Sequence, residues 1–282
     1  MNKIFCVIPS HNRIKELNNC ITCVRKQSFN NWELIVVDDG SSDGTSNYIN
    51  SLSSNKINLL KGDGSLWWGG AMKLGMKYVL NKSEDDDYLL MLNDDVHFGS
   101  KIFEYLIADT IKNPKSIIGV MQQSILDDKV LYSGFNIDYY KMEIKYSFDQ
   151  IDAFPGRGML VPIEIIKIIG SVNSYLFPHY MADLEFSARA VDKGYQLFSS
   201  DNAIIRSDPK KSDSEIQNKG IFSALFNARS RRNIIYRIIF FSIRGPILLR
   251  LIAIPRFFIT RSIKFCNIIS LRFIDKFSTT SS

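Results

Sequence analysis

The sequence predicts an α/β fold with a mostly parallel, open sheet flanked by helices, followed by a basic helical extension. Two observations support this prediction: short apolar runs alternate with helical segments, and basic residues collect toward the carboxyl end of the chain. With 282 residues, 45% of them hydrophobic, the chain is long enough to bury a large core. We therefore expect one main domain with an appendage.

Four apolar runs in the first hundred residues have the composition of strands that are buried on both faces. They cover residues 4–9, 32–38, 57–60 and 88–93. Helical segments are expected between them, near residues 14–26, 44–51 and 70–81. This order predicts a parallel sheet over residues 1–120, and such sheets bind ligands at the carboxyl ends of their strands.

The pattern changes in residues 121–206, where strand candidates become shorter and richer in aromatic residues. Helices are expected to begin near Ile163 and within the segment ADLEFSARAVDKGY. We therefore assign residues 1–206 to one domain with two halves, 1–120 and 121–206. Residues 207–282 form a separate C-terminal region, and the polar segment 207–215 is the linker candidate.

Acidic side chains follow the second and fourth strand candidates. VVDDGSSDGT places Asp39 after the second strand, and LLMLNDDV ends the fourth with Asn93, Asp94 and Asp95. Turn and cap chemistry explains the first motif as well as nucleotide binding does. Adjacent carboxylates repel each other unless water or a cation balances them, so the second motif fits either a solvated turn or a Mg²⁺ site completed by phosphates.

A third acidic cluster lies in YMADLEFSARAVDKGY, where Asp183 and Glu185 fall in the first turn of the expected helix. The helix dipole stabilises acids at this position, so their presence alone does not require a catalytic role.

The segment GDGSLWWGGAMKLGM contains paired glycines and two adjacent tryptophans. Its glycine spacing differs from the dinucleotide-binding fingerprint, which argues against a Rossmann dehydrogenase. Trp67 or Trp68 could stack on a sugar or base, although one of them could equally belong to the core. Gly69 and Gly70 could let the backbone approach a diphosphate at the start of a helix.

Five motifs, in order along the chain, resemble those of family 2 glycosyltransferases with the GT-A fold. They are VIPSHNR (7–13), VVDDGSSDGT (36–45), LLMLNDDV (89–96), GRGMLVP (156–162) and YMADLEFSARAVDKGY (180–195). The resemblance spans residues 1 to about 205 and extends to rhamnosyltransferase-like members that build bacterial surface polysaccharides, such as O-antigen or capsule. It implies a GT-A catalytic domain over residues 1–206 and a UDP- or dTDP-linked sugar as donor.

The resemblance also implies roles for individual residues on the donor side. Asp95 stands where the family binds Mg²⁺ or Mn²⁺ and is the expected metal ligand, whereas Asn93 replaces an acid that is usual in this motif. The expected donor neighbours are Pro9, His11, Arg13, Asp39, Gly64, Trp67, Trp68, Gly69, Asn93 and Asp94.

The family's inverting members take their general base from a late acidic pair. Asp183 matches the aspartate of this pair and is the expected base, but Ala182 replaces its acidic neighbour. Glu185 is the second choice. An alternative reading, a non-catalytic nucleotide-sugar-binding or scaffolding relative, rests on Asn93 and Ala182 replacing acids. A nucleotidyltransferase is a weaker alternative, because SHNRIKE replaces the glycine-rich, basic phosphate loop expected after its first strand.

The C-terminal region is strongly basic and apolar. Residues 221–282 contain nine arginines and two lysines against one acid, a net charge of +10, whereas the whole chain carries +6. No uncharged run between Arg232 and Lys264 exceeds six residues, which excludes a spanning helix of about 20 apolar residues. Pro246 and Pro255 predict a division into short helices.

Arginines among aliphatic residues favour contact between residues 221–282 and an anionic membrane surface. A helical cap on the catalytic domain and an oligomer interface remain alternatives, and no recognition motif supports nucleic-acid binding. The N-terminus shows no signal-peptide pattern. We therefore expect a cytoplasmic enzyme, peripheral on the inner face of the plasma membrane, that acts on a lipid-linked glycan acceptor.

Overall fold

The computed structural model of the chain describes residues 2–209, 225, 227, 230, 233–256 and 259. Most of the linker candidate and the basic residues after Ile259 lie outside these residues, so the corresponding expectations are not addressed by the structure.

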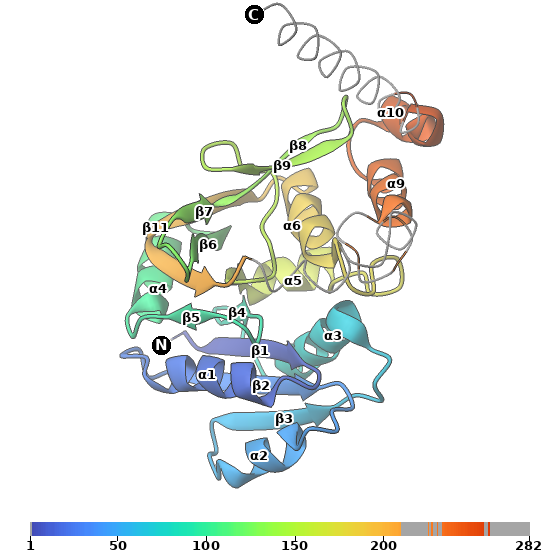
Figure 1. Cartoon of the computed structure of the whole chain (residues 1–282). Helices are drawn as coiled ribbons and strands as arrows, with labels where there is room; N and C mark the ends of the chain where they lie inside the picture. The colour runs from blue at the N-terminus through green and yellow to red at the C-terminus, as the bar shows by residue number, and fades with distance from the viewer. Residues whose placement is uncertain are drawn as a thin grey trace, which may run out of the picture.

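Within the described residues, nine strands form one mixed sheet (Figure 1). The strands are β1 (Ile4–Ser10), β2 (Trp32–Asp38), β3 (Ile57–Lys61), β4 (Tyr88–Met91), β5 (His97–Phe98), β6 (Ser116–Ser124), β7 (Val130–Tyr132), β10 (Met159–Pro162) and β11 (Gln196–Ser207). Their order is β3-β2-β1-β4-β10-β6-β11-β5, with β7 paired to β6. Strands β1 to β4 are mutually parallel, whereas β10 runs antiparallel to both β4 and β6.

Helices cover both faces of the sheet. They are α1 (Ile14–Arg25), α2 (Thr45–Ser51), α3 (Trp67–Leu80), α4 (Ile102–Lys112), α5 (Ile163–Ile169), α6 (Ala182–Asp192), α9 (Ile234–Ile243) and α10 (Ile247–Leu251). In β1, Phe5 and Val7 join the core beneath α3, α5, α6 and α9, while the alternate residues join the core beneath α1, α2 and α4. Burial on both faces explains why these strands are continuous apolar runs.

The sheet and its flanking helices agree with the expected α/β fold class, with two main differences in element boundaries. The fourth strand ends at Met91, so Asn93 to Asp95 lie in the loop that follows it. Helix α3 begins at Trp67 rather than near residue 70, because the Gly70 amide already donates a hydrogen bond to the Leu66 carbonyl. The paired glycines therefore lie inside the first turn of the helix.

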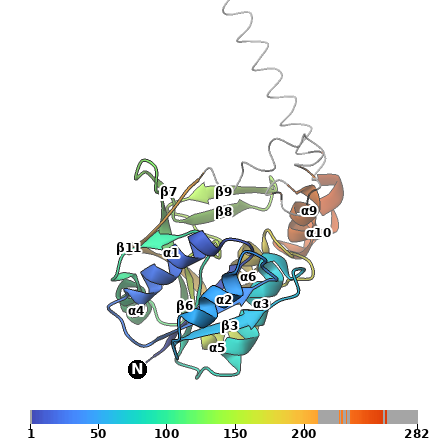
Figure 2. The ribbon, with the colours of Figure 1, turned by 60° about the horizontal axis from the view of Figure 1, so that its bottom comes forward.

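The described part of the C-terminal region packs on the main domain. Tyr236, Phe240 and Phe241 of α9 are buried in the same core as α3 and α6. Figures 1 and 2 both place α9 and α10 beside a hairpin formed by β8 (Gly134–Asp138) and β9 (Glu143–Ser147). Among the described residues, no helix is long and apolar enough to cross a membrane.

Candidate functional site

A cavity of about 1730 Å³ opens at the carboxyl ends of β1, β2 and β4. Strand β1 lies between β2 and β4, which is the switch point where open α/β sheets bind ligands. Because β10 is antiparallel, the segment before it, with Gly156 and Arg157, meets the same edge. The expected residues in the cavity lining are Pro9, His11, Arg13, Asp39, Gly64, Trp67, Trp68, Asn93, Asp94, Asp95 and Asp183.

Two arginines neutralise the carboxylate pair that follows β4. Arg13 Nη1 lies 3.1 Å from Asp94 Oδ1, and its Nη2 lies 3.3 Å from Asp95 Oδ2. Arg157 Nη2 approaches the same Asp95 oxygen at 3.7 Å. The mutual repulsion of the two acids is thus balanced by cations from the β1–α1 loop and from the segment before β10.

Asp94 is the more deeply buried of the two acids, with 4% of its surface exposed. Burial raises the pKa of its carboxyl to about 6, against the opposing charge of Arg13 and a 2.9 Å hydrogen bond from the Ser10 hydroxyl. The fold therefore holds this carboxyl closer to protonation than an ordinary aspartate.

Asp95 has the properties expected of a metal ligand. Its Oδ1 is buried and has no hydrogen-bond partner in the structure, while its Oδ2 faces both arginines. No cluster of three or more ligating side chains occurs in the described part of the chain. Mg²⁺ is commonly bound by one or two carboxylates together with substrate phosphates and water, so the free Asp95 oxygen fits such an ion if a diphosphate supplies further ligands.

Asp39 organises the loop that leads into α3. Its Oδ1 accepts hydrogen bonds from the amides of Gly64 at 2.9 Å and Leu66 at 3.3 Å, and its Oδ2 accepts one from Trp67 at 2.8 Å. These contacts are the capping chemistry that was one of the two interpretations of the motif. A carboxylate has about four acceptor positions, so Asp39 can also face a ligand in the cavity.

Both tryptophans of this segment line the cavity. The Trp68 indole donates a hydrogen bond of 3.0 Å to Asn93 Oδ1. Asn93, which replaces an acid that is usual in this motif, therefore makes a structural contact. Trp67 meets the ring of His179 edge to face, with centroids 5.7 Å apart. The two indoles therefore join the loop after β4 to the loop before α6.

Three of the segments that line the cavity contain a non-glycine residue with left-handed backbone geometry. The φ angles are 53° at Asn12, 58° at Trp67 and 72° at Met181. Asparagine adopts this region readily, whereas larger residues do so at a cost in free energy. The backbone conformations of Trp67 and Met181 are thus unfavourable by themselves, and contacts with the surrounding residues must stabilise them.

Gly69 does not occupy the place expected for it. It is absent from the cavity lining, and its amide donates a 2.7 Å hydrogen bond to the Pro178 carbonyl. A Cβ at this position would lie 2.6 Å from the Phe177 carbonyl oxygen and 2.9 Å from that of Pro178. The expectation that Gly69 brings the backbone near a diphosphate is therefore corrected: this glycine allows the loop before α6 to pack against α3.

Asp183 lies in the first turn of α6 and faces the cavity. Its Oδ2 accepts a 2.7 Å hydrogen bond from the Gly156 amide, and its Oδ1 accepts one of 2.9 Å from the Leu184 amide. Burial raises the pKa of the carboxyl, and these two amides oppose the shift. A carboxyl with a raised pKa in a cavity is a candidate proton acceptor.

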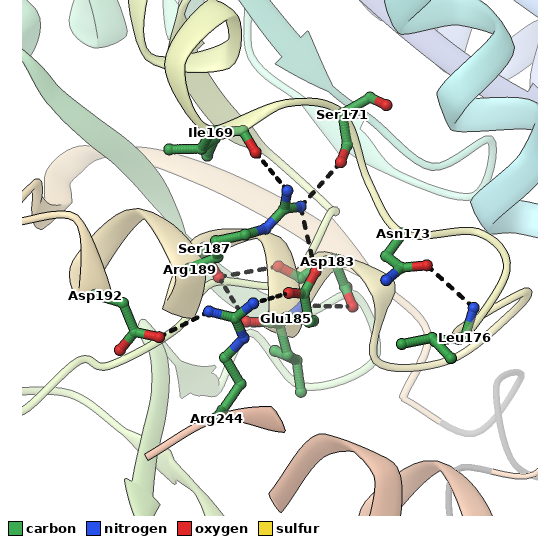
Figure 3. A network of polar contacts seen from close by, with 11 residues as sticks. Ile169, Ser171, Asn173, Leu176, Asp183, Glu185, Ser187, Arg189, Asp192 and Arg244 are labelled. Carbon is green, nitrogen blue, oxygen red and sulfur yellow. Dashed lines mark hydrogen bonds and ion pairs between the residues drawn. The ribbon is translucent and has the colours of Figure 1, made fainter. Parts of the chain in front are cut away.

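Glu185 lies outside the cavity lining and is 1% exposed. Its carboxylate is held by Arg189 at 3.2 Å and by Arg244 at 2.7 Å, as Figure 3 shows. The second choice of base is thus engaged in ion pairs on the side of α6 that faces α9.

The profile of glycosyl transferase family 2 matches residues 5–168, more than half of the chain. The chain belongs to this family. Over 108 residues it is 32% identical to WfgD of Escherichia coli, described as a UDP-Glc:alpha-D-GlcNAc-diphosphoundecaprenol beta-1,3-glucosyltransferase; this match covers 38% of the chain and 40% of WfgD. An uncharacterized glycosyltransferase of Rickettsia typhi is 25% identical over 199 residues, which cover 67% of the chain and 59% of that relative. The match therefore spans less than two thirds of each of these relatives.

Solved glycosyltransferase structures share the fold. S. aureus TarS superposes with a TM-score of 0.56 at 15% identity, covering 75% of this chain and 37% of TarS. GalNAc-T7, crystallised with UDP, GalNAc and Mn²⁺, gives a TM-score of 0.62 at 14% identity, covering 74% of this chain and 44% of that one. The GT-A-type fold of this family 2 glycosyltransferase is thereby confirmed.

Several cavity residues of this glycosyltransferase were missed from its sequence. They are Ser10, Arg157, His179 and Arg237. Arg157 lies in the GRG motif, but its place beside Asp95 depends on the antiparallel direction of β10, which the motif does not reveal. Arg237 comes from α9, so the C-terminal region contributes a basic side chain to the cavity.

Proposed function

We propose that the chain transfers a sugar from a nucleoside diphosphate donor to a hydroxyl of a lipid-linked glycan, with inversion at the anomeric carbon, in the synthesis of a bacterial surface polysaccharide. One observation carries the proposal: a single cavity gathers the carboxylates of Asp39, Asp94, Asp95 and Asp183 from three distant segments of a family 2 chain.

The donor occupies the part of the cavity between β1, β2 and β4. Asp39 and the Trp67 indole are placed to receive a nucleoside, while Arg13 and Arg157 supply positive charge beside the NDD loop. A departing nucleoside diphosphate gains negative charge, which fixed cations at this edge stabilise. UDP or dTDP is the expected carrier; WfgD is named for UDP-glucose, and GalNAc-T7 was crystallised with UDP.

A divalent cation, Mg²⁺ or Mn²⁺, completes the proposed donor site. Asp95 would hold it through the unpartnered Oδ1, and the donor diphosphate would supply further oxygen ligands. When bound, the ion neutralises charge on the leaving group.

Asp183 is the proposed general base. The acceptor hydroxyl gives its proton to the Asp183 carboxylate as its oxygen attacks the anomeric carbon, and the bond from that carbon to the diphosphate oxygen breaks. The Gly156 and Leu184 amides fix the direction of the carboxylate before the acceptor arrives. A single displacement of this kind inverts the configuration of the sugar.

The acceptor is proposed to be lipid-linked, which brings the enzyme to a membrane surface. WfgD is named for an acceptor that carries a diphosphoundecaprenol group. Helix α10 exposes Leu248 by 74% and Leu251 by 80%, an apolar surface suited to the boundary of a bilayer. Arg244, Arg250 and Arg256 bind protein acceptors and Arg237 of α9 lines the cavity, so α10 would meet lipid mainly through its apolar side chains.

The proposal is tested with a panel of UDP- and dTDP-sugars and a synthetic GlcNAc-diphospholipid as acceptor, with Mg²⁺ or Mn²⁺, scored by glycolipid product and nucleoside diphosphate release. Transfer from at least one donor, lost on addition of EDTA, is the expected result. Binding of UDP or dTDP without turnover on any donor would instead support the non-catalytic alternative.

Asp183→Asn tests the base. Loss of a general base lowers kcat by about 10²- to 10⁴-fold, while donor affinity should be retained. Asp149→Asn, a change at an exposed aspartate outside the cavity, is the matched control. Asp183→Asn turning over near the wild-type rate would remove Asp183 from the mechanism.

A further inference from the structure

Helices α9 and α10, together with the turn between them, contact several segments that surround the acceptor side of the cavity. Tyr236 of α9 packs edge to face on Phe177 in the loop before α6, with ring centroids 6.3 Å apart. Phe241 packs in the same manner on Tyr139, at the tip of the β8–β9 hairpin, at 6.1 Å. Both the loop and the hairpin supply side chains to the cavity lining, including His179 and Tyr146.

Arg244, at the end of α9, binds directly to the helix that carries Asp183. Its Nη2 lies 2.7 Å from Glu185 Oε1 and its Nη1 2.7 Å from Asp192 Oδ2, so one guanidinium joins the first and last turns of α6 (Figure 3). The Glu185 carboxylate is fully buried, and without Arg244 only the longer ion pair with Arg189, at 3.2 Å, would balance it. A buried charge that loses one of its partners is destabilised. The position of α6 is therefore sensitive to Arg244.

The hairpin is attached by contacts of a different kind. Arg256 Nη2 donates hydrogen bonds to the carbonyls of Tyr139 at 2.6 Å and Tyr140 at 2.7 Å. Gly245 lies directly against the Tyr139 ring, where a Cβ would come within 2.3 Å of it. The α9–α10 turn thus fixes the hairpin and α6 at the same time.

We propose that Arg244 is a positioning residue: through Glu185 it fixes α6 and so the direction of the Asp183 carboxylate, which makes α9 and α10 a structural part of the acceptor site. The inference deepens the proposed function, because it rests on Asp183 being the base. Asp183 and Glu185 share the first turn of α6, and the Gly156 amide meets Asp183 at 2.7 Å only while that turn keeps its place.

The test compares full-length wild type with Arg244→Met, Arg244→Lys and Arg25→Met. Arg25 is the matched control, since it is an exposed arginine in the last turn of α1, outside the cavity lining. Three quantities are measured: amide hydrogen exchange over residues 183–187, the affinity for UDP and dTDP, and the kinetics of transfer to a GlcNAc-diphospholipid, including the pH dependence of kcat.

Arg244→Met should raise exchange in residues 183–187 at least tenfold, lower kcat/KM for the acceptor at least tenfold, and change nucleotide affinity less than twofold. The acidic limb of the kcat profile should move to higher pH, because Asp183 loses the Gly156 amide that opposes its raised pKa. Arg244→Lys should recover part of each effect, and Arg25→Met should resemble wild type.

Unchanged exchange in residues 183–187 of Arg244→Met would overturn the inference. A loss of nucleotide affinity as large as the loss of kcat/KM for the acceptor would also overturn it, because it would indicate general destabilisation. If wild type transfers no sugar, the proposed function fails, yet the exchange measurement still decides whether Arg244 fixes α6.

Discussion

The Asp94 carboxyl should make the free energy of unfolding depend on pH in the opposite direction to a salt-bridged surface acid. Burial raises its pKa from the ordinary 3.8 to about 6. Between about pH 4 and pH 6 the folded state therefore keeps a proton that the unfolded state has released. The contribution of Asp94 to the free energy of unfolding is fully present below about pH 4 and falls as the pH rises to about 6.

We expect the free energy of unfolding of wild type, minus that of Asp94→Asn, to fall by about 2 kcal/mol between pH 4 and pH 6. Urea unfolding in EDTA at four pH values measures this difference, which cancels the titration of carboxyls that do not interact with Asp94. Parallel curves for the two proteins would show that Asp94 ionises in the fold as easily as in water.

At the scale of elements, the contact between α3 and the loop before α6 depends on a missing side chain. Gly69→Ala should displace the Phe177 and Pro178 carbonyls and cost about 1–3 kcal/mol, as overpacking does elsewhere. Gly70→Ala is the neighbouring control, because its Cβ would meet only the Leu66 side chain and alanine favours the helix. Thermal unfolding of both variants measures the contrast; equal stability would contradict the role given to Gly69.

A second prediction at this scale concerns the exposed face of α10. Leu248→Asp with Leu251→Asp should reduce flotation with phosphatidylglycerol vesicles at least tenfold, because each change places a charge where apolar contact is proposed. Ile111→Asp on α4 is the control: Ile111 is 77% exposed, similar to the two leucines, and its replacement should leave flotation unchanged. Equal binding by all three proteins would exclude α10 as the membrane contact.

The elements also show what the sequence could predict. Strands buried on both faces are recognisable from composition, and parallel pairing of β1 with β2 and β4 then places Asp39 and the NDD loop at one edge. The direction of β10 and the pairing of Glu185 with Arg244, 59 positions apart, leave no local pattern. Gly69 was misplaced because a glycine that admits a ligand and one that admits a neighbouring loop look the same in sequence.

At the scale of the whole molecule, the main domain (residues 1–206) and the described C-terminal helices share one core. Phe240 is fully buried and Phe241 nearly so, in a cluster that includes α3 and α6 residues. A chain that ends at residue 232 should therefore lose several kcal/mol of stability, because removal of a buried phenylalanine alone costs about 3–5 kcal/mol.

A chain that ends at residue 259 keeps these helices and should unfold at a higher temperature than the chain that ends at residue 232, as measured by circular dichroism. Comparing the two truncations tests whether the described C-terminal helices stabilise the fold. Equal stability of both would mean that α9 is dispensable for the fold. A membrane-binding test should not delete all of residues 221–282, since that would remove the buried Tyr236, Phe240 and Phe241 along with the basic residues.

The left-handed backbone of Trp67 has a consequence for how this enzyme can change by selection. A bulky residue in this region costs about 1–2 kcal/mol that glycine would not pay, and the molecule bears this cost whether or not substrate is present. Glycine at position 67 would relieve this backbone cost but would also lose the indole and its packing on His179. Recovery of tryptophan at this position from libraries screened for turnover, but not from libraries screened for thermal stability alone, would mark the cavity rim as a site where catalytic fitness outweighs stability.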